Sequence, residues 1–212
     1  MGRTSPAVSW ILNGASQEWI FETHDADRHA IPCDEYRRST RMDRKFDETC
    51  MKLALEEAEK AGARGEVPVG AILLRGDQVL AKDHNRCIEL SDPTAHAEIL
   101  VLRKGGEILR NYRLNGTVMY VTAEPCPMCV SAMVHGRISK LVFGVSEPKF
   151  GAVESKFRLL SRKDMNHKVK VERGILEKEC GEILKVFFRE RRGRESYKLR
   201  VMSAELAGKG IR

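Results

Sequence analysis

The chain has 212 residues, of which 42% are hydrophobic and 32% charged, and its formal net charge is +7. This length and composition are typical of one globular domain with a sizeable buried core, and the positive charge favours a polyanionic partner. No segment approaches the roughly 18 apolar residues of a membrane span, and the N-terminus lacks the unbroken apolar run of a secretory signal. We therefore expect a cytoplasmic protein that does not associate with membranes.

Residues 1–41 differ from the rest of the chain. They hold both tryptophans, proline and glycine interrupt them, and their apolar residues follow no clear period. We predict a disordered extension or a misplaced start, with Met42 as the natural first residue, and a small added module is the alternative. From Met42 onward, apolar residues recur at three- and four-residue steps, which predicts an amphipathic helix that ends at Gly62 or Gly65.

The next part of the chain alternates β-rich and helical patterns. An apolar run over 67–74, a turn at 75–78 and a return run over 79–85 predict a hairpin, and Asp92 is the expected N-cap of the helix that follows. The order then expected is helix 94–104, strand 116–124, helix 127–135, strand 138–145, strand 169–173 and helix 175–192. This order predicts an α/β three-layer sandwich, with a central mixed five-stranded sheet and helices on both faces.

Residues 193–212 are expected to form a basic tail. From Arg189 to Arg212 the sequence has eight Lys or Arg against three Glu. Such an excess of positive charge indicates either a solvated helix end or an element that contacts phosphate groups.

Three residues offer the soft ligands that zinc prefers. Among six cysteines, Cys126 and Cys129 form the one close pair, and three-residue spacing places both on one face of a helical turn. In a chain of this size without an export signal, such a pair indicates metal binding or redox chemistry more than a disulfide. His96 and the pair both lie near predicted helix N-termini at one sheet edge. We therefore predict a zinc site of His96, Cys126 and Cys129, with one position open for water.

Glu98 lies two residues after His96 and is the expected proton shuttle. In the first turn of a helix its carboxylate can lie over the open metal position, take a proton from water and deliver it to a ring nitrogen and then to a leaving amine. Taken singly, each of these residues also fits a role outside catalysis. Glu98 can complement the helix dipole, the cysteine pair can be a redox site, and Cys87 or His84 can complete a structural four-ligand zinc site.

The segments HAE (96–98) and PCPMC (125–129) together resemble the signature of the zinc-dependent nucleoside and nucleobase deaminases of the cytidine deaminase superfamily. Over roughly residues 43–192 the chain is similar in particular to the bacterial deaminases of the tRNA wobble adenosine, in stretches such as EVPVGAILL, DPTAHAEIL and FFRERR. The resemblance implies a deaminase domain over 42–192 and one Zn²⁺ per subunit. It further implies hydrolytic conversion of adenosine to inosine, recognition of a tRNA anticodon loop, and a homodimer.

The resemblance also implies roles for single residues. His96, Cys126 and Cys129 are expected to hold the zinc, and Glu98 to transfer protons. The expected substrate-binding residues are Asn85, which would hydrogen-bond the flipped nucleoside, Val69 and Ala97 at the base pocket, Glu147, Asn166 at the anticodon loop, and Phe188 near the target base. The neighbouring Phe187 is expected to pack in the core.

The chain departs from the family pattern in one loop. Glu147 stands where these enzymes usually have aspartate, and the extra methylene is expected to shift a contact to the neighbouring ribose. Phe150 and Glu154 replace residues that are usually smaller.

Two other functions fit parts of the sequence. A guanine- or cytosine-type deaminase of free bases carries the same core motifs, but the basic, aromatic end FFRERR suits a polyanion better. A non-catalytic, RNA-binding zinc subunit would have no need of Glu98.

Overall fold

The computed structural model describes residues 11–12, 19–20 and 40–208, with side chains described over 44–193. The chain divides into two compact units, residues 1–37 and 38–212. In the first, β1 (Ile11–Leu12) pairs antiparallel with β2 (Trp19–Ile20). The predictions made for residues 1–41 otherwise fall outside the described residues.

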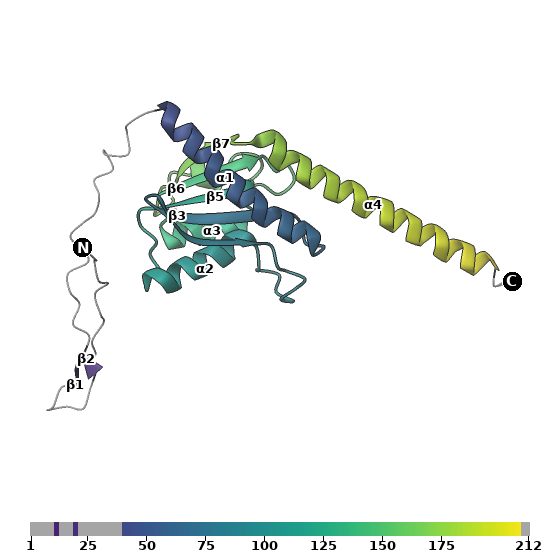
Figure 1. Ribbon diagram of the computed structural model, residues 1–212, viewed down its shortest axis with the longest axis horizontal. Coiled ribbons are helices and arrows are strands. Elements are labelled where there is room, and N and C mark those ends of the chain that lie inside the picture. The colour runs from purple at the N-terminus through teal and green to yellow at the C-terminus, as the bar shows by residue number, and fades with distance from the viewer. Residues whose placement is uncertain (1–10, 13–18, 21–39, 209–212) are drawn as a thin grey trace, which may run out of the picture. The chain divides into compact units, whose positions relative to one another are not determined.

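The second unit is an α/β domain built on one five-stranded sheet (Figure 1). The strand order is β4-β3-β5-β6-β7, with β3 antiparallel to both of its neighbours and β5, β6 and β7 mutually parallel. The sheet is therefore mixed, as predicted. Its elements are α1 (Thr40–Ala63), β3 (Gly70–Arg75), β4 (Gln78–His84), α2 (Ala97–Leu109), β5 (Thr117–Ala123), α3 (Pro127–Gly136), β6 (Lys140–Val145), the short 3-10 helix η2 (Leu159–Ser161), β7 (Lys170–Arg173) and α4 (Glu177–Gly208).

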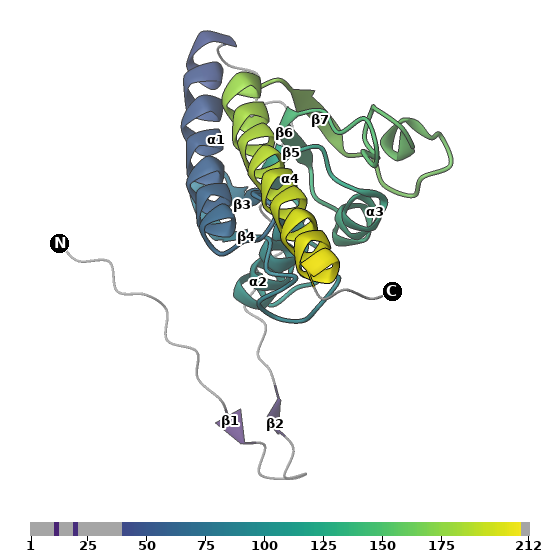
Figure 2. The ribbon, with the colours of Figure 1, turned by 90° about the vertical axis from the view of Figure 1, so that its right-hand side faces the viewer.

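Helices cover both faces of this sheet. Figure 2 shows α1 and α4 together on one face and α2 with α3 on the other. Side-chain alternation along the strands explains the two cores, because successive residues of a strand point to opposite faces. Leu73 of β3 packs in the core under α2 and α3, whereas Ile72 and Leu74 pack in the core under α1 and α4. The predicted three-layer sandwich is confirmed.

The predicted bounds of two helices are wrong, and the first of them, α2, ends at Leu109 instead of Lys104. α2 begins at Ala97, because residue 96 is still extended, and the Asp92 carboxylate closes a local turn by accepting hydrogen bonds from the Thr94 amide and hydroxyl. α4 continues to Gly208 instead of ending near Arg192. A single glycine at 193 does not end the helix, since the following residues are mostly good helix formers.

Among the described residues, no helix combines the length and apolar character that crossing a membrane requires.

Gly70 opens the strand that lies beneath α1. A Cβ atom at this position would lie 2.1 Å from the Ala54 carbonyl oxygen and 2.5 Å from the Ala58 amide nitrogen. The close packing of helix on sheet therefore requires glycine here.

Gly70→Ala is expected to lower the free energy of unfolding by about 1 to 3 kcal/mol, because α1 must move off the sheet. Gly106→Ala in α2 is the matched control. Its Cβ would meet no atom closer than 3.6 Å, so the added methyl should leave stability unchanged or raise it by up to about 1 kcal/mol. Urea denaturation of both variants measures the difference, and equal stability of the two variants would contradict this packing account.

Candidate active site

The candidate site lies where α2 and α3 begin, beyond the carboxyl end of β5. His96 and Cys126 are the residues at the N-cap positions of these two helices, both in extended conformation, and neither side chain caps its own helix. Cys129 follows one turn into α3 and is buried. The helix starts therefore direct an imidazole and two thiols toward one another from separate parts of the chain.

The three ligand atoms form a nearly equilateral triangle. The Cys126 and Cys129 sulfurs lie 3.6 Å apart, and His96 Nδ1 lies 3.7 Å from the first and 3.6 Å from the second. Tetrahedral zinc, with bonds of about 2.3 Å to sulfur and about 2.0 Å to nitrogen, requires edges of about 3.5 to 3.8 Å. The donor set and its spacing therefore fit zinc, and within the described residues this group has three members and no fourth ligand.

The protein environment prepares these groups to bind a cation. Hydrogen bonding with Cys129, aided by His96, lowers the pKa of Cys126 to about 4 against the opposing effect of burial. The same contact raises the pKa of Cys129, and the contact with Cys126 raises the pKa of His96. The lowered pKa favours the thiolate form of Cys126, and a bound metal ion would displace the proton of the Cys129 thiol.

Glu98 lies in the first turn of α2 with only 3% of its surface exposed. Its Oε2 atom is buried and has no hydrogen-bond partner in the described part of the chain. Burial raises the pKa of this carboxyl above its ordinary value. An unsatisfied buried carboxyl oxygen is costly, so it marks a position where a further polar group is expected to bind.

His84 does not complete a four-ligand site. Its Nδ1 contacts the Glu57 carboxylate at 3.1 Å, and its Nε2 contacts the Arg64 guanidinium at 3.1 Å. Both ring nitrogens of His84 are therefore already in contact with other side chains, one from α1 and one from the residue that directly follows it.

Three predicted base-pocket residues come together beside His96. The backbone amide of Asn85 donates a hydrogen bond to the Val69 carbonyl at 3.0 Å. The side-chain oxygen Oδ1 of Asn85 accepts a hydrogen bond from the backbone amide of Ala97 at 2.9 Å. Its Nδ2 donates to the Val67 carbonyl at 3.2 Å. Asn85 thus binds the first amide of α2, which gives it a structural role beside the contact with the nucleoside expected from the sequence.

The other predicted contact residues lie on separate elements. Glu147 is half-buried in the loop after β6, and its Oε1 accepts a hydrogen bond from the Lys149 amide at 2.9 Å. Asn166 is exposed in the segment before β7. Phe188 is exposed on α4, with its ring 5.4 Å from that of Phe187 in an edge-on arrangement.

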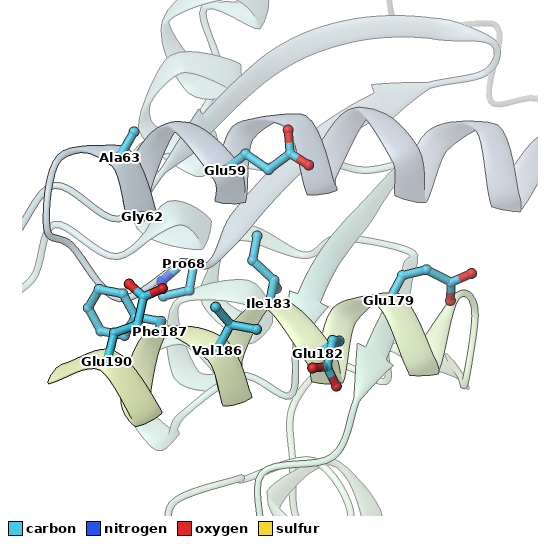
Figure 3. Close-up of a pocket in the computed structure, with 10 residues that line it drawn as sticks. All are labelled: Glu59, Gly62, Ala63, Pro68, Glu179, Glu182, Ile183, Val186, Phe187 and Glu190. Carbon is cyan, nitrogen blue, oxygen red and sulfur yellow. The ribbon is translucent and has the colours of Figure 1, made fainter. Parts of the chain in front are cut away.

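Phe187 lines a groove between α1 and α4 (Figure 3) of about 470 Å³ and is half-buried, not enclosed in the core as expected. Ile183, Val186 and Pro68 line the same groove. It is also lined by four exposed glutamates that form no ion pair within residues 44–193, namely Glu59, Glu179, Glu182 and Glu190. Their unneutralised charge disfavours a polyanion in this groove.

Two buried carboxylates that sequence analysis missed hold the loops around the site. Glu66 Oε1 accepts hydrogen bonds from the amides of Ile88 and Glu89, at 2.7 and 3.0 Å, in the loop that leads to His96. Glu124 directly precedes the PCPMC segment. An acidic residue at the end of a buried strand was a signal that could have identified Glu124, whereas Glu66 follows a glycine turn and gives no such signal.

Glu124 holds the loop after β6 through both carboxylate oxygens. They accept hydrogen bonds from the Ser155 hydroxyl and from the backbone amides of Glu147, Val153, Glu154 and Ser155, the amides at 2.8 to 3.0 Å. Burial works to raise the pKa of Glu124, but these hydrogen bonds outweigh it and lower the pKa overall. The carboxylate is therefore ionised at neutral pH and fixes the loop beside Cys126.

Comparison with known proteins agrees with this geometry. The profile of the MafB19-like deaminase family matches residues 46–192. A tRNA-specific adenosine deaminase of Haemophilus influenzae is 48% identical over 148 residues, which make up 69% of this chain and 86% of the relative. One from Bacillus subtilis is 44% identical over 146 residues, covering 69% and 91%. The chain belongs to the tRNA-specific adenosine deaminase family.

Solved structures of other deaminases share the fold of this chain. A chain from a study of A-to-I editing by tRNA:A34 deaminases at the wobble position shares 48% identity, with a TM-score of 0.63 over 64% of this chain and 99% of that one. A guanine deaminase from Nitrosomonas europaea has a TM-score of 0.54 at 20% identity, over 66% of this chain and 83% of that one. The second likeness is one of fold alone.

Glu124→Gln is expected to loosen the loop after β6, because an amide has one acceptor oxygen and its NH₂ group faces donors. Hydrogen exchange should accelerate at the amides of Glu147 and Val153 to Ser155, and the free energy of unfolding should fall by about 1.5 to 3 kcal/mol.

The folded-state pKa of Glu124 is lowered, so its stabilisation is present above the ordinary glutamate pKa and is lost as the pH falls through the lowered value. The difference between the wild type and Glu124→Gln should therefore stay constant from about pH 6 to 8. Glu107→Gln, at an exposed position of α2, is the control. Unchanged exchange in the loop of Glu124→Gln would contradict the assigned role.

Proposed function

We propose that this protein is a zinc-dependent hydrolase that converts adenosine to inosine at the wobble position of tRNA. The observation that carries the proposal is the convergence of His96, Cys126 and Cys129 beside the buried Glu98. Relatives 44 to 49% identical to the chain are tRNA-specific adenosine deaminases, which favours adenosine in RNA as the substrate.

His96 Nδ1 and the sulfurs of Cys126 and Cys129 would hold the zinc ion, one per subunit. When bound, zinc supplies the Lewis-acid chemistry that makes water nucleophilic near neutral pH. Hydrolytic deamination forms a bond from C6 of adenine to the water oxygen and breaks the bond from C6 to the amino nitrogen, so that water and adenosine give inosine and ammonia. The residues of this chain must therefore move protons and hold the base.

Glu98 is the residue that we assign to proton transfer. Its Oε2 is buried without a hydrogen-bond partner in the described chain, so it can accept a proton from the attacking water. It would return that proton to a ring nitrogen and carry another to the departing amino group. Burial excludes competing solvent from this exchange.

Asn85, Val69 and Ala97 would form the wall against which the flipped adenosine lies. Asn85 is 8% exposed, and its hydrogen bonds to Val67 and Ala97 fix the plane of its amide. Its Nδ2 carries a second hydrogen, which we propose is donated to the nucleoside. Val69 is half-buried and would offer an apolar surface to the base, and the fully buried Ala97 would support this wall from within.

Glu147, Asn166 and Phe188 would contact the anticodon loop outside this pocket. All three are at least partly exposed, and Phe188 offers an aromatic face for a nucleotide. The acidic groove between α1 and α4 would repel phosphate, which directs the RNA away from the face that carries Phe187.

The protein is further proposed to act as a homodimer in the cytoplasm, as the family resemblance implies. Light scattering at micromolar protein should give about twice the mass of one chain, and a monomeric mass would contradict the dimer.

Glu98→Gln is expected to reduce inosine formation in an anticodon stem-loop by roughly 10²- to 10⁴-fold, because it removes the proton acceptor while preserving shape. Zinc content and RNA affinity should remain those of the wild type. Glu107→Gln on the same helix is the control and should keep full activity. Wild-type turnover by Glu98→Gln would show that the assigned chemistry is wrong, whereas an inactive wild type that binds RNA would indicate a non-catalytic subunit.

A further inference from the structure

The loop after β6 displays two phenylalanines to solvent. Phe150 is 60% exposed and Phe157 is 42% exposed, and their rings meet edge to face with centroids 5.6 Å apart. Burying a phenylalanine side chain is worth about 1.5 to 3 kcal/mol, and Phe150 forgoes most of this gain while Phe157 forgoes a substantial part of it. Their placement is therefore not explained by the stability of the domain, and exposed paired aromatics are typical of a binding surface.

The backbone holds these two residues in a fixed relation. Phe150 precedes Gly151, and the Phe157 amide donates to the Gly151 carbonyl at 3.1 Å, which closes the loop. Gly151 packs directly against the Glu124 side chain, since a Cβ atom at position 151 would lie 2.5 Å from the Glu124 carboxylate. The next residue, Ala152, is fully buried in the core. The aromatic pair is thus displayed on a loop that is already ordered.

Each phenylalanine follows a lysine in the sequence. Lys149 directly precedes Phe150 and Lys156 directly precedes Phe157, and both lysines are exposed and form no ion pair within residues 44–193. The one acidic residue between them in sequence, Glu154, is neutralised by Arg173 at 2.9 Å. Aromatic faces flanked by free cations are the combination that binds single-stranded nucleic acid, because bases stack on the rings while the cations contact phosphates.

The pair is tied to the candidate active site. The Ala152 amide donates to the Pro125 carbonyl at 2.9 Å, and Pro125 directly precedes the metal ligand Cys126. A strand of RNA whose target base reaches the metal ligands must have its neighbouring nucleotides nearby.

We propose that Phe150 and Phe157 form a stacking platform for one unpaired base of the RNA loop that flanks the target adenosine. This inference rests on the proposed function and names a further part of the substrate that the site binds. The platform adds affinity through one base and takes no part in the chemistry at C6.

The test compares Phe150→Ala, Phe157→Ala and the conservative Phe150→Tyr in the full chain loaded with zinc. An anticodon stem-loop with a wobble adenosine is the probe. Each alanine variant should weaken stem-loop binding roughly 5- to 100-fold and raise KM similarly, while kcat at saturating RNA stays that of the wild type. Phe150→Tyr keeps the aromatic face and should retain wild-type affinity. Tyr112→Ala is the matched control and should change nothing, because this residue is 73% exposed and precedes the start of β5, whereas Cys126 follows the end of that strand.

Stem-loops that lack the base at single positions identify the stacked nucleotide. At one position next to the adenosine, removal of the base should weaken wild-type binding by the same factor as Phe150→Ala, and the two changes together should cost no more than either alone. Wild-type affinity in both alanine variants would overturn the proposal. The proposal would also be overturned if, at every position, the loss of affinity caused by Phe150→Ala simply added to the loss caused by removing the base. Unchanged RNA binding with a changed oligomeric mass would also overturn it, by assigning the pair to a protein contact.

The two proposals fail differently. If the wild type forms no inosine in the stem-loop, the proposed function fails regardless of Phe150. If the wild type edits the stem-loop and the alanine variants match it in KM, only the platform fails.

Discussion

The helices α2 and α3 begin side by side at the same end of the strands of one sheet. The candidate site depends on this placement of the two helix starts. His96 and Cys126 lie about thirty residues apart in sequence, yet each is the last extended residue before a helix. The parallel pairing of β5 with β6 requires α3 to cross over between them, which fixes the start of α3 beside the end of β5. Displacing either helix start would separate the nitrogen from the sulfurs and remove the fit to a tetrahedral metal.

Buried carboxylates extend this order from the helix starts to the loops. Glu66 holds the loop that leads to His96, and Glu124 holds the loop that follows β6. Glu66 accepts two backbone amide hydrogen bonds and Glu124 accepts four, which compensates for burying their charge. Glu98 differs because its buried Oε2 has no partner in the described residues. The contrast separates carboxylates that hold loops from the one whose unpartnered oxygen supports the proposed proton transfer.

Much of the fold and the grouping of His96, Cys126 and Cys129 could be predicted from the sequence, because both depend on local patterns. Alternating and helical hydrophobic periods identified the five strands of the sheet, and the spacing of His96, Cys126 and Cys129 identified the cluster. Asp92 was wrongly predicted to cap α2, since a turn over Thr94 competes for its carboxylate. The roles of Glu66 and Glu124 depend on amides more than twenty residues away, contacts that no local pattern contains.

The same limit applies to the surfaces. The exposed pairing of Phe150 with Phe157 arises from a loop that closes on Gly151, and the sequence alone showed only that Phe150 departs from the family pattern. Conversely, the run FFRERR predicted one core and one exposed aromatic, and the structure instead gives a half-buried Phe187 in an acidic groove. Burial of single side chains on α4 depends on its packing against α1, which periodicity does not determine.

The most direct test of the central claim uses the wild-type protein loaded with zinc. Inosine formation is measured in an anticodon stem-loop with a wobble adenosine, with free guanine and cytidine as parallel substrates. The account predicts inosine in the stem-loop and no turnover of guanine or cytidine. Deamination of a free substrate with the stem-loop left intact would contradict it, and would assign the same metal cluster to a small-molecule deaminase.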